Sequence, residues 1–131
     1  MKKMITLCTV AALFLCGAAQ AQPDNTPEQR AKRLTRQMDK TLKLNKTQKK
    51  KVAEINLTYF QKEEELKQRQ DEGIGQGQYQ QDLLHLVAER NWELKEALSA
   101  SQYTTYMEYD NATKKMLQQE QRKQRREEKE E

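Results

Sequence analysis

The chain has 131 residues, of which 34% are charged, 35% apolar and 6% aromatic, and its formal net charge is +4. Its cysteines, Cys8 and Cys16, both lie close to the N-terminus, and His85 is the single histidine. This composition disfavours a zinc site, which wants three or four cysteine or histidine ligands, and it disfavours catalysis by a nucleophile with a histidine base. We therefore expect a protein that is not an enzyme and carries no metal or cofactor.

The first 21 residues have the pattern of a cleavable signal peptide. Lys2 and Lys3 are followed by an apolar run up to Cys16 and by the small-x-small sequence Ala19-Gln20-Ala21. The apolar run is about 13 residues long, shorter than the roughly 20 that cross a bilayer as a helix. An uncleaved anchor and a lipoprotein signal are the alternatives, and Leu15 before Cys16 disfavours the second. We expect cleavage after Ala21 and export to the periplasm.

Cleavage would leave residues 22–131, which contain no cysteine. Of these 110 residues 31 are apolar and 42 are charged, so the apolar share is well below the usual 45–50%. A compact single core is hard to build from so few apolar side chains. We expect long exposed helices, or helices that bury an apolar stripe against a second subunit, as in a homodimer.

The first predicted helix begins at Thr26, the expected N-cap, and Pro27 occupies its first position. Apolar residues then recur with helical spacing at Ala31, Leu34, Met38 and Leu42. Residues 30–51 carry ten basic side chains, and Asp39 is their only acidic one. Since an exported protein meets little nucleic acid, we expect unfolded polypeptide or a membrane surface as partner, and no nucleic acid.

A second helix is predicted from Asn45, whose cap Gln48 can complete. Its apolar positions are Val52, Ile55, Tyr59, Phe60 and Leu66. Gly73, Gly75 and Gly77 should end it and form a turn. A third helix is then expected over about residues 78–97, with Leu83, Val87, Leu94 and Leu98 on one face. Leu84, Leu86 and Trp92 are expected to broaden that face. No segment shows sustained strand alternation, so the predicted fold class is all-α.

A fourth helix is predicted from Ser99, with Gln102 completing its cap and apolar positions from Tyr103 to Leu117. Residues 118–131 contain no apolar side chain, so we expect this charged tail to fray. The predicted organisation is a signal peptide (1–21), a helical domain of four helices and helical hairpins (22–117) and the tail (118–131).

Two segments of the same form open the second and fourth predicted helices. They are Leu44-Asn45-Lys46-Thr47-Gln48 and Leu98-Ser99-Ala100-Ser101-Gln102. In both, a leucine, a capping residue and a glutamine stand at the same spacing, and each cap is worth roughly 1 kcal/mol. The pair resembles the duplicated LTxxQ motif of the Spy/CpxP-like periplasmic proteins, with Asn45 and Ser99 where that family has threonine.

The resemblance implies an antiparallel dimer of bent helices that forms a shallow cradle. It also implies a stress-response role as an ATP-independent chaperone, a holdase, for unfolded or aggregation-prone envelope proteins. Other relatives regulate a sensor kinase or bind metals. The alternatives are therefore an envelope-stress regulator or adaptor with one specific protein partner and, with less support from a lone His85, a metal-binding sensor.

A holdase needs an adaptable surface that combines weak apolar contacts with charge. The first predicted helix offers interleaved cationic and apolar side chains, and two aromatic residues follow on the second. The residues inferred to bind clients are Arg33, Leu34, Arg36, Met38, Lys40, Leu42, Lys43, Tyr59 and Phe60. The alternative is that this apolar stripe is core and that the charges only confer solubility.

Overall fold

The computed structural model describes residues 25–130, which form four α-helices. They are α1 (Pro27–Leu42), α2 (Lys46–Asp71), α3 (Gln76–Ala97) and α4 (Ala100–Glu130). No strand occurs in the described part of the chain, so the all-α prediction is confirmed. The third helix starts two residues earlier than expected, and the predicted signal peptide lies outside the described residues. None of the four helices is long and apolar enough to cross a membrane.

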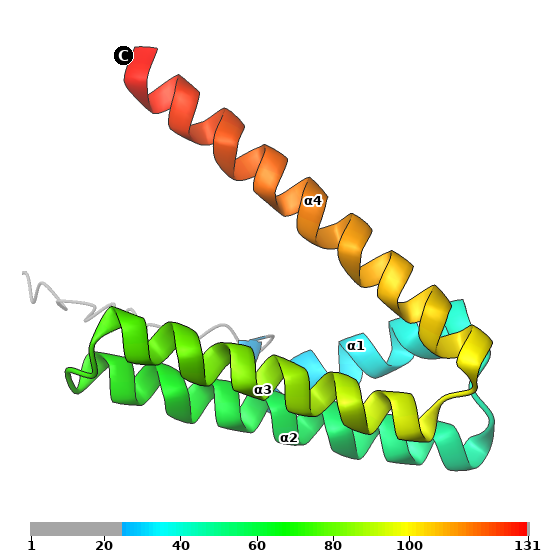
Figure 1. Cartoon of the computed structure of the whole chain (residues 1–131). Coiled ribbons are helices and arrows are strands. Elements are labelled where there is room, and N and C mark those ends of the chain that lie inside the picture. Colours follow the sequence, from blue (N-terminus) through cyan, green and yellow to red (C-terminus); the bar gives the residue numbers. More distant parts are fainter. Residues whose placement is uncertain (1–24, 131) are drawn as a thin grey trace, which may run out of the picture.

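The helices α2 and α3 lie side by side as a long hairpin, and α1 packs along α2 (Figure 1). The α1–α2 and α3–α4 connections meet at one end of this hairpin. From there α4 diverges, so that an open angle separates most of its length from the other three helices (Figure 1).

The turn between α2 and α3 is built on one glycine. Gly73 has φ +109°, a left-handed conformation that residues with a Cβ rarely adopt. Its N–H donates to the carbonyl of Gln70 at 3.1 Å, and the N–H of Ile74 donates to that of Arg69 at 3.1 Å. This is the paired bonding of a Schellman C-cap, and it ends α2 where the glycine cluster predicts an end.

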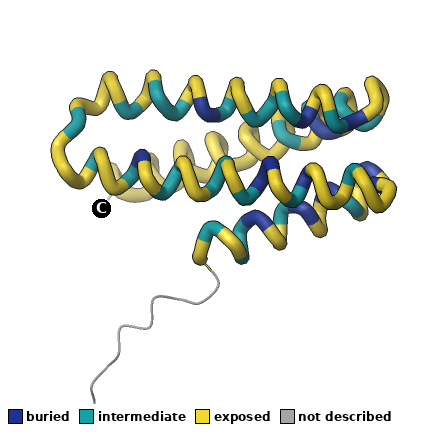
Figure 2. Tube along the Cα trace, turned by 90° about the horizontal axis from the view of Figure 1, so that it is seen from below, coloured by how far each residue is buried: buried dark blue, intermediate teal, exposed yellow. Residues whose placement is uncertain are grey.

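The core is small and lies at the end where the two connections meet. Val52 and Leu94 are fully buried there. Around them pack side chains from α1, α2, α4 and the two connections that meet there, namely Met38, Leu42, Leu44, Ile55, Leu98 and Tyr106. Buried positions are sparse elsewhere on the four helices (Figure 2). The few apolar residues of the sequence therefore hold one end of the molecule together.

One buried contact between α1 and α2 is polar. Asn56 is 0% exposed, and its amide donates to Thr35 Oγ1 at 3.0 Å. Among the described residues the Asn56 Oδ1 atom has no hydrogen-bond partner, and a buried amide oxygen without one costs about 1–3 kcal/mol. This pair therefore specifies how α1 sits on α2 more than it stabilises the contact.

The charged C-terminal segment forms the end of α4. The helix α4 runs without a break to Glu130, and residues 111–129 are all exposed (Figure 2). We call residues 111–130 the α4 arm. An isolated helix of this length is marginal in water, and i,i+4 pairs such as Lys123–Glu127 at 3.9 Å add only tenths of a kcal/mol. The arm is thus a helix with no packing partner within the described chain.

Candidate functional site

The two repeated segments form reciprocal capping boxes. In the first, Asn45 Oδ1 accepts from the N–H of Gln48 at 2.8 Å, and Gln48 Oε1 accepts from the N–H of Asn45 at 3.1 Å. In the second, Ser99 Oγ accepts from the N–H of Gln102 at 3.2 Å, and Gln102 Oε1 accepts from the N–H of Ser99 at 2.9 Å. Asn45 and Ser99 therefore act as N-caps, as their positions in the sequence predict.

The two capping glutamines are also bonded to each other. Gln48 Nε2 lies 2.7 Å from Gln102 Oε1, and Gln102 Nε2 lies 3.1 Å from Gln48 Oε1. Each side-chain amide also donates to a backbone carbonyl at the C-terminus of a helix. Gln48 donates to the carbonyl of Ala97, the last residue of α3, at 3.4 Å, and Gln102 donates to that of Leu42, the last residue of α1, at 3.2 Å. The repeat thus forms one approximately two-fold set of bonds, which we call the glutamine pair.

The glutamine pair fixes the end of the molecule from which α4 departs. Its bonds use carbonyls at the C-termini of α1 and α3, which have no partner inside their own helices. Because it joins the α1–α2 connection to the α3–α4 connection, it determines where α4 begins relative to the hairpin. The repeat is therefore structural, and the surfaces that it positions are the candidate binding sites.

The outer face of α1 is cationic, but its apolar side chains do not share that face. Arg33, Arg36, Lys40 and Lys43 are exposed, as the client-binding hypothesis requires. The apolar residues inferred with them point inward: Met38 is 3% exposed, Leu42 is 7% exposed, and Leu34 is half-buried against the core.

The expectation that Met38 and Leu42 contact clients is therefore corrected. Residues three and four apart lie on one face of a helix, and on α1 that face packs against α2 and α4. These side chains are core, and the cations are what α1 presents to solvent. The alternative reading of the stripe as core is the right one for these two residues.

Tyr59 and Phe60 are half-buried and are engaged within the chain. Their rings meet edge to face, with centroids 5.2 Å apart. The guanidinium of Arg30 lies 4.3 Å from the Phe60 centroid, and that of Arg90 lies 4.2 Å from the Tyr59 centroid. Burial raises the pKa of Tyr59, and Arg90 opposes part of the shift. Each ring is thus stacked under an arginine, which leaves little of it to a client.

Tyr106 anchors the start of α4 in the core. It is 4% exposed, and its hydroxyl lies 3.4 Å from Asn91 Oδ1 on α3. Burial raises its pKa to about 12, because the ionised form would lose its hydration. One turn further on, the amide of Gln37 on α1 donates to the hydroxyl oxygen of Tyr109. These contacts attach the first turns of α4 and leave the arm beyond them unattached.

The exposed apolar surface lies on α3 and α4, where sequence reasoning did not place client binding. Leu84 is 68% exposed and Trp92 is 65% exposed, and their spacing of eight residues puts them on one side of α3. On α4, Tyr109, Met116 and Leu117 are 39%, 69% and 54% exposed. These are the large apolar side chains that the described part of the chain exposes, so they are the candidates for contact with a partner.

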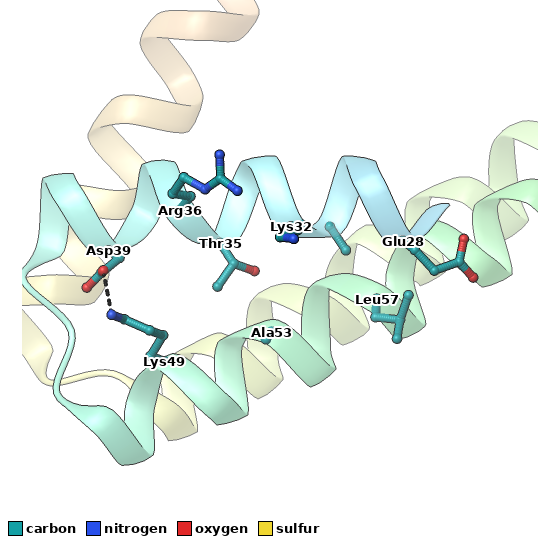
Figure 3. Close-up of a pocket in the computed structure, with 9 residues that line it drawn as sticks. Glu28, Lys32, Thr35, Arg36, Asp39, Lys49, Ala53 and Leu57 are labelled. Carbon is teal, nitrogen blue, oxygen red and sulfur yellow. Dashed lines mark ion pairs between the residues drawn. The ribbon is translucent and has the colours of Figure 1, made fainter. Parts of the chain in front are cut away.

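A groove of about 480 Å³ runs between α1 and α2 (Figure 3). Small side chains face each other across its floor: Ala31 and Thr35 on α1, and Ala53 on α2. At one end Lys49 Nζ lies 2.9 Å from Asp39 Oδ2, and Glu28 and Leu57 lie at the other end (Figure 3). Lys32 and Arg36 line the α1 side. The groove exists because the facing residues are too small to fill the seam.

His85 is exposed on α3. Among the described residues, no group of three or more His, Cys, Asp and Glu side chains is placed to hold a metal ion. The structure therefore offers no donor set, within residues 25–130, for the metal-sensor alternative.

The family model described as "Domain of unknown function (DUF4890)" matches residues 17–126, so the chain belongs to this family. The match takes in all of α1, α2 and α3 and most of α4. No curated protein and no solved structure is found to be similar.

Proposed function

We propose that this protein is a periplasmic, ATP-independent holdase, of the kind that the resemblance to Spy/CpxP-like proteins implies. The observation that carries the proposal is the exposed pair Leu84 and Trp92 on α3, in a chain that buries few apolar residues. A holdase must offer apolar area to many different clients without folding around any one of them. A tryptophan and a leucine on a regular helix provide such area at little entropic cost.

The cations of α1 provide the second element of the proposal. Arg36, Lys40 and Lys43 are exposed; the first two lie on α1, which contacts α4, and Lys43 is the C-cap residue of α1. Exposed charge acts over a Debye length of about 8 Å at physiological salt, so it would attract acidic segments before apolar contact forms. In this scheme the cations raise the rate of capture, and the α3 surface retains the client.

The dimer belongs to the same proposal. Leu117 follows Tyr106 by eleven residues, close to three full turns, so both lie on nearly the same side of α4. Tyr106 is buried, but Leu117 and the neighbouring Met116 are not. A second copy that covers the arm would bury these side chains and close the angle between α4 and the hairpin into a cradle.

The test of the function is aggregation of a denatured client, diluted into buffer without nucleotide. We expect a several-fold molar excess of the protein to slow the rise of light scattering, and to do so less at high salt. Failure with every client tried would overturn the proposal. Binding to one envelope protein in a pull-down, without general protection, would instead favour the regulator or adaptor.

The test of the dimer is a mass measurement by light scattering. We expect twice the protomer mass for the parent protein and the protomer mass for the Met116→Lys/Leu117→Lys variant. Gln118→Lys/Gln119→Lys, which adds the same charge on the same arm, is the control and should remain dimeric. A monomeric parent protein would remove the dimer from the proposal.

A further inference from the structure

The groove between α1 and α2 carries chemistry that the holdase proposal, which uses only Arg36 of its lining, does not explain. Its volume of about 480 Å³ falls within the range of small-molecule sites. From Glu28 to Asp39 it follows α1 for roughly 16 Å, at 1.5 Å per residue. A long, narrow and mainly apolar groove of this kind suits one extended alkyl chain better than a compact ring.

The polar group in its floor favours an anion. Thr35 points from α1 into the seam between the helices (Figure 3). Its Oγ1 already accepts the Asn56 amide at 3.0 Å, so the hydroxyl hydrogen remains to be donated. Thr41, Thr104, Thr105 and Thr113 donate theirs to the carbonyl four residues earlier, whereas Thr35 has no such bond. A ligand oxygen above Thr35 would complete its hydrogen bonding.

The side chains next to Thr35 are positively charged, as a site for an anion requires. Lys32 and Arg36 lie three residues before and one residue after it, both are exposed, and neither forms an ion pair within residues 25–129. Asp39 is neutralised by Lys49, and Glu28 stands at the opposite end. Lys32 and Arg36 therefore flank Thr35 along α1, and the guanidinium of Arg36 is directed away from α2, so that it would have to turn to reach a group bound at Thr35 (Figure 3).

We infer that this groove binds a single-chain amphiphile with an anionic head, a carboxylate or a phosphate. The head would accept from Thr35, with Lys32 and Arg36 folding over it, and the alkyl chain would lie along Ala31, Ala53 and Leu57. The contacts are charge-assisted hydrogen bonds at the head and apolar burial along the chain. This site is independent of the α3 surface proposed for clients.

The test is titration of the whole protein with decanoate and decyl phosphate below their micelle concentrations, followed by calorimetry and by amide NMR shifts. We expect saturable binding with shifts centred on Thr35 and Ala53, and weaker binding of decanol, which lacks the charge. Tighter binding of decanoate would assign a fatty acid as the ligand, and tighter binding of decyl phosphate would assign a phospholipid-derived one.

Three variants test whether the amphiphile binds in the groove between α1 and α2. Lys32→Gln/Arg36→Gln should weaken binding about tenfold, as expected for losing charge-assisted contacts. Ala53→Leu should fill the groove and abolish binding, with circular dichroism confirming that the helices persist. Lys40→Gln/Lys43→Gln removes the same charge from α1 outside the groove and should bind within about twofold of the parent.

Three results would overturn the inference. They are no saturable binding of either probe, decanol binding as tightly as decanoate, and equal weakening by the two charge-matched double variants. None of them bears on client aggregation, so this site and the holdase proposal can fail separately.

Discussion

At the scale of single residues, the glutamine pair makes the most consequential contacts. Gln48→Ala and Gln102→Ala should each lower the free energy of unfolding by about 1–3 kcal/mol, because each leaves buried or partly buried partners unsatisfied. The double variant should cost less than the sum, by about 1 kcal/mol or more, since both singles break the same amide–amide bonds. Denaturant unfolding of the four proteins measures this, and strict additivity would contradict the pair. Gln118→Ala, on the arm, should be neutral.

The buried pair of Thr35 and Asn56 allows a second test. Thr35→Val removes the acceptor of the Asn56 amide and should cost about 1–3 kcal/mol. Adding Asn56→Leu removes the stranded amide as well, so the double variant should recover much of that loss. Thermal or denaturant unfolding compares them. If the double variant were less stable than Thr35→Val alone, the Asn56 amide would stabilise the fold by more than its hydrogen bond to Thr35.

Tyr106 makes stability depend on pH in the alkaline range. Its pKa is about 12 in the folded chain and about 10 when unfolded, so only the unfolded state loses its proton between these values. The free energy of unfolding should be unaffected by this group below pH 10. It should then fall by up to about 1.4 kcal/mol per pH unit as the pH rises towards 12.

Tyr106→Phe should reduce that alkaline slope. A smaller slope remains from Tyr59, whose pKa is raised in the same direction by burial. Denaturant unfolding from pH 9 to pH 12 measures both proteins. An unchanged slope in the variant would show that Tyr106 is not the group responsible.

At the scale of elements, the α4 arm should be separable from the rest. Gln118→Pro should unwind residues after about 117 and lower the helical circular dichroism signal. It should hardly move the denaturant midpoint, because among the described residues none after Met107 packs in or against the core. Gln61→Pro, in the middle of α2, is the control and should cost about 3 kcal/mol or more. A large loss of stability from Gln118→Pro would mean that the arm is packed.

Helix starts and ends could be predicted because they are encoded locally. Thr26, Asn45, Ser99 and Gly73 each act within a few residues of their own position in the chain. The contact between Gln48 and Gln102 could not be predicted in this way. It joins residues 54 positions apart and depends on how the hairpin aligns the two connections.

The sequence predicted less well which side chains are exposed and could bind a partner. The helical spacing of the α3 residues nevertheless contained part of that information. Residues two apart on a helix are about 200° apart, so Leu84 and Trp92 fall opposite the buried Leu86 and Leu94. That spacing could have placed them on the surface. The groove at Ala31 and Ala53 required the pairing of α1 with α2, which no local pattern provides.

At the scale of the whole molecule, the buried core and the exposed apolar side chains form two separate sets of residues. The core lies at one end, where the glutamine pair and Tyr106 hold all four helices. Trp92 lies at this end too, on the side of α3 opposite the buried Leu94, whereas Leu84 and the α4 arm lie further from the core. Clients could be bound at these exposed side chains without unfolding the core. This division is what the holdase proposal requires of a chain with so few apolar residues.

The most direct test of the holdase proposal compares how well two double variants of α3 protect a client from aggregation. Leu84→Ser/Trp92→Ser removes the exposed apolar pair, and Gln81→Ser/Lys95→Ser changes exposed polar residues of the same helix. At equal excess over a denatured client and without nucleotide, we predict that the first loses most of the suppression of light scattering and that the second retains it. Equal protection by both variants, with their helical content unchanged, would contradict the account.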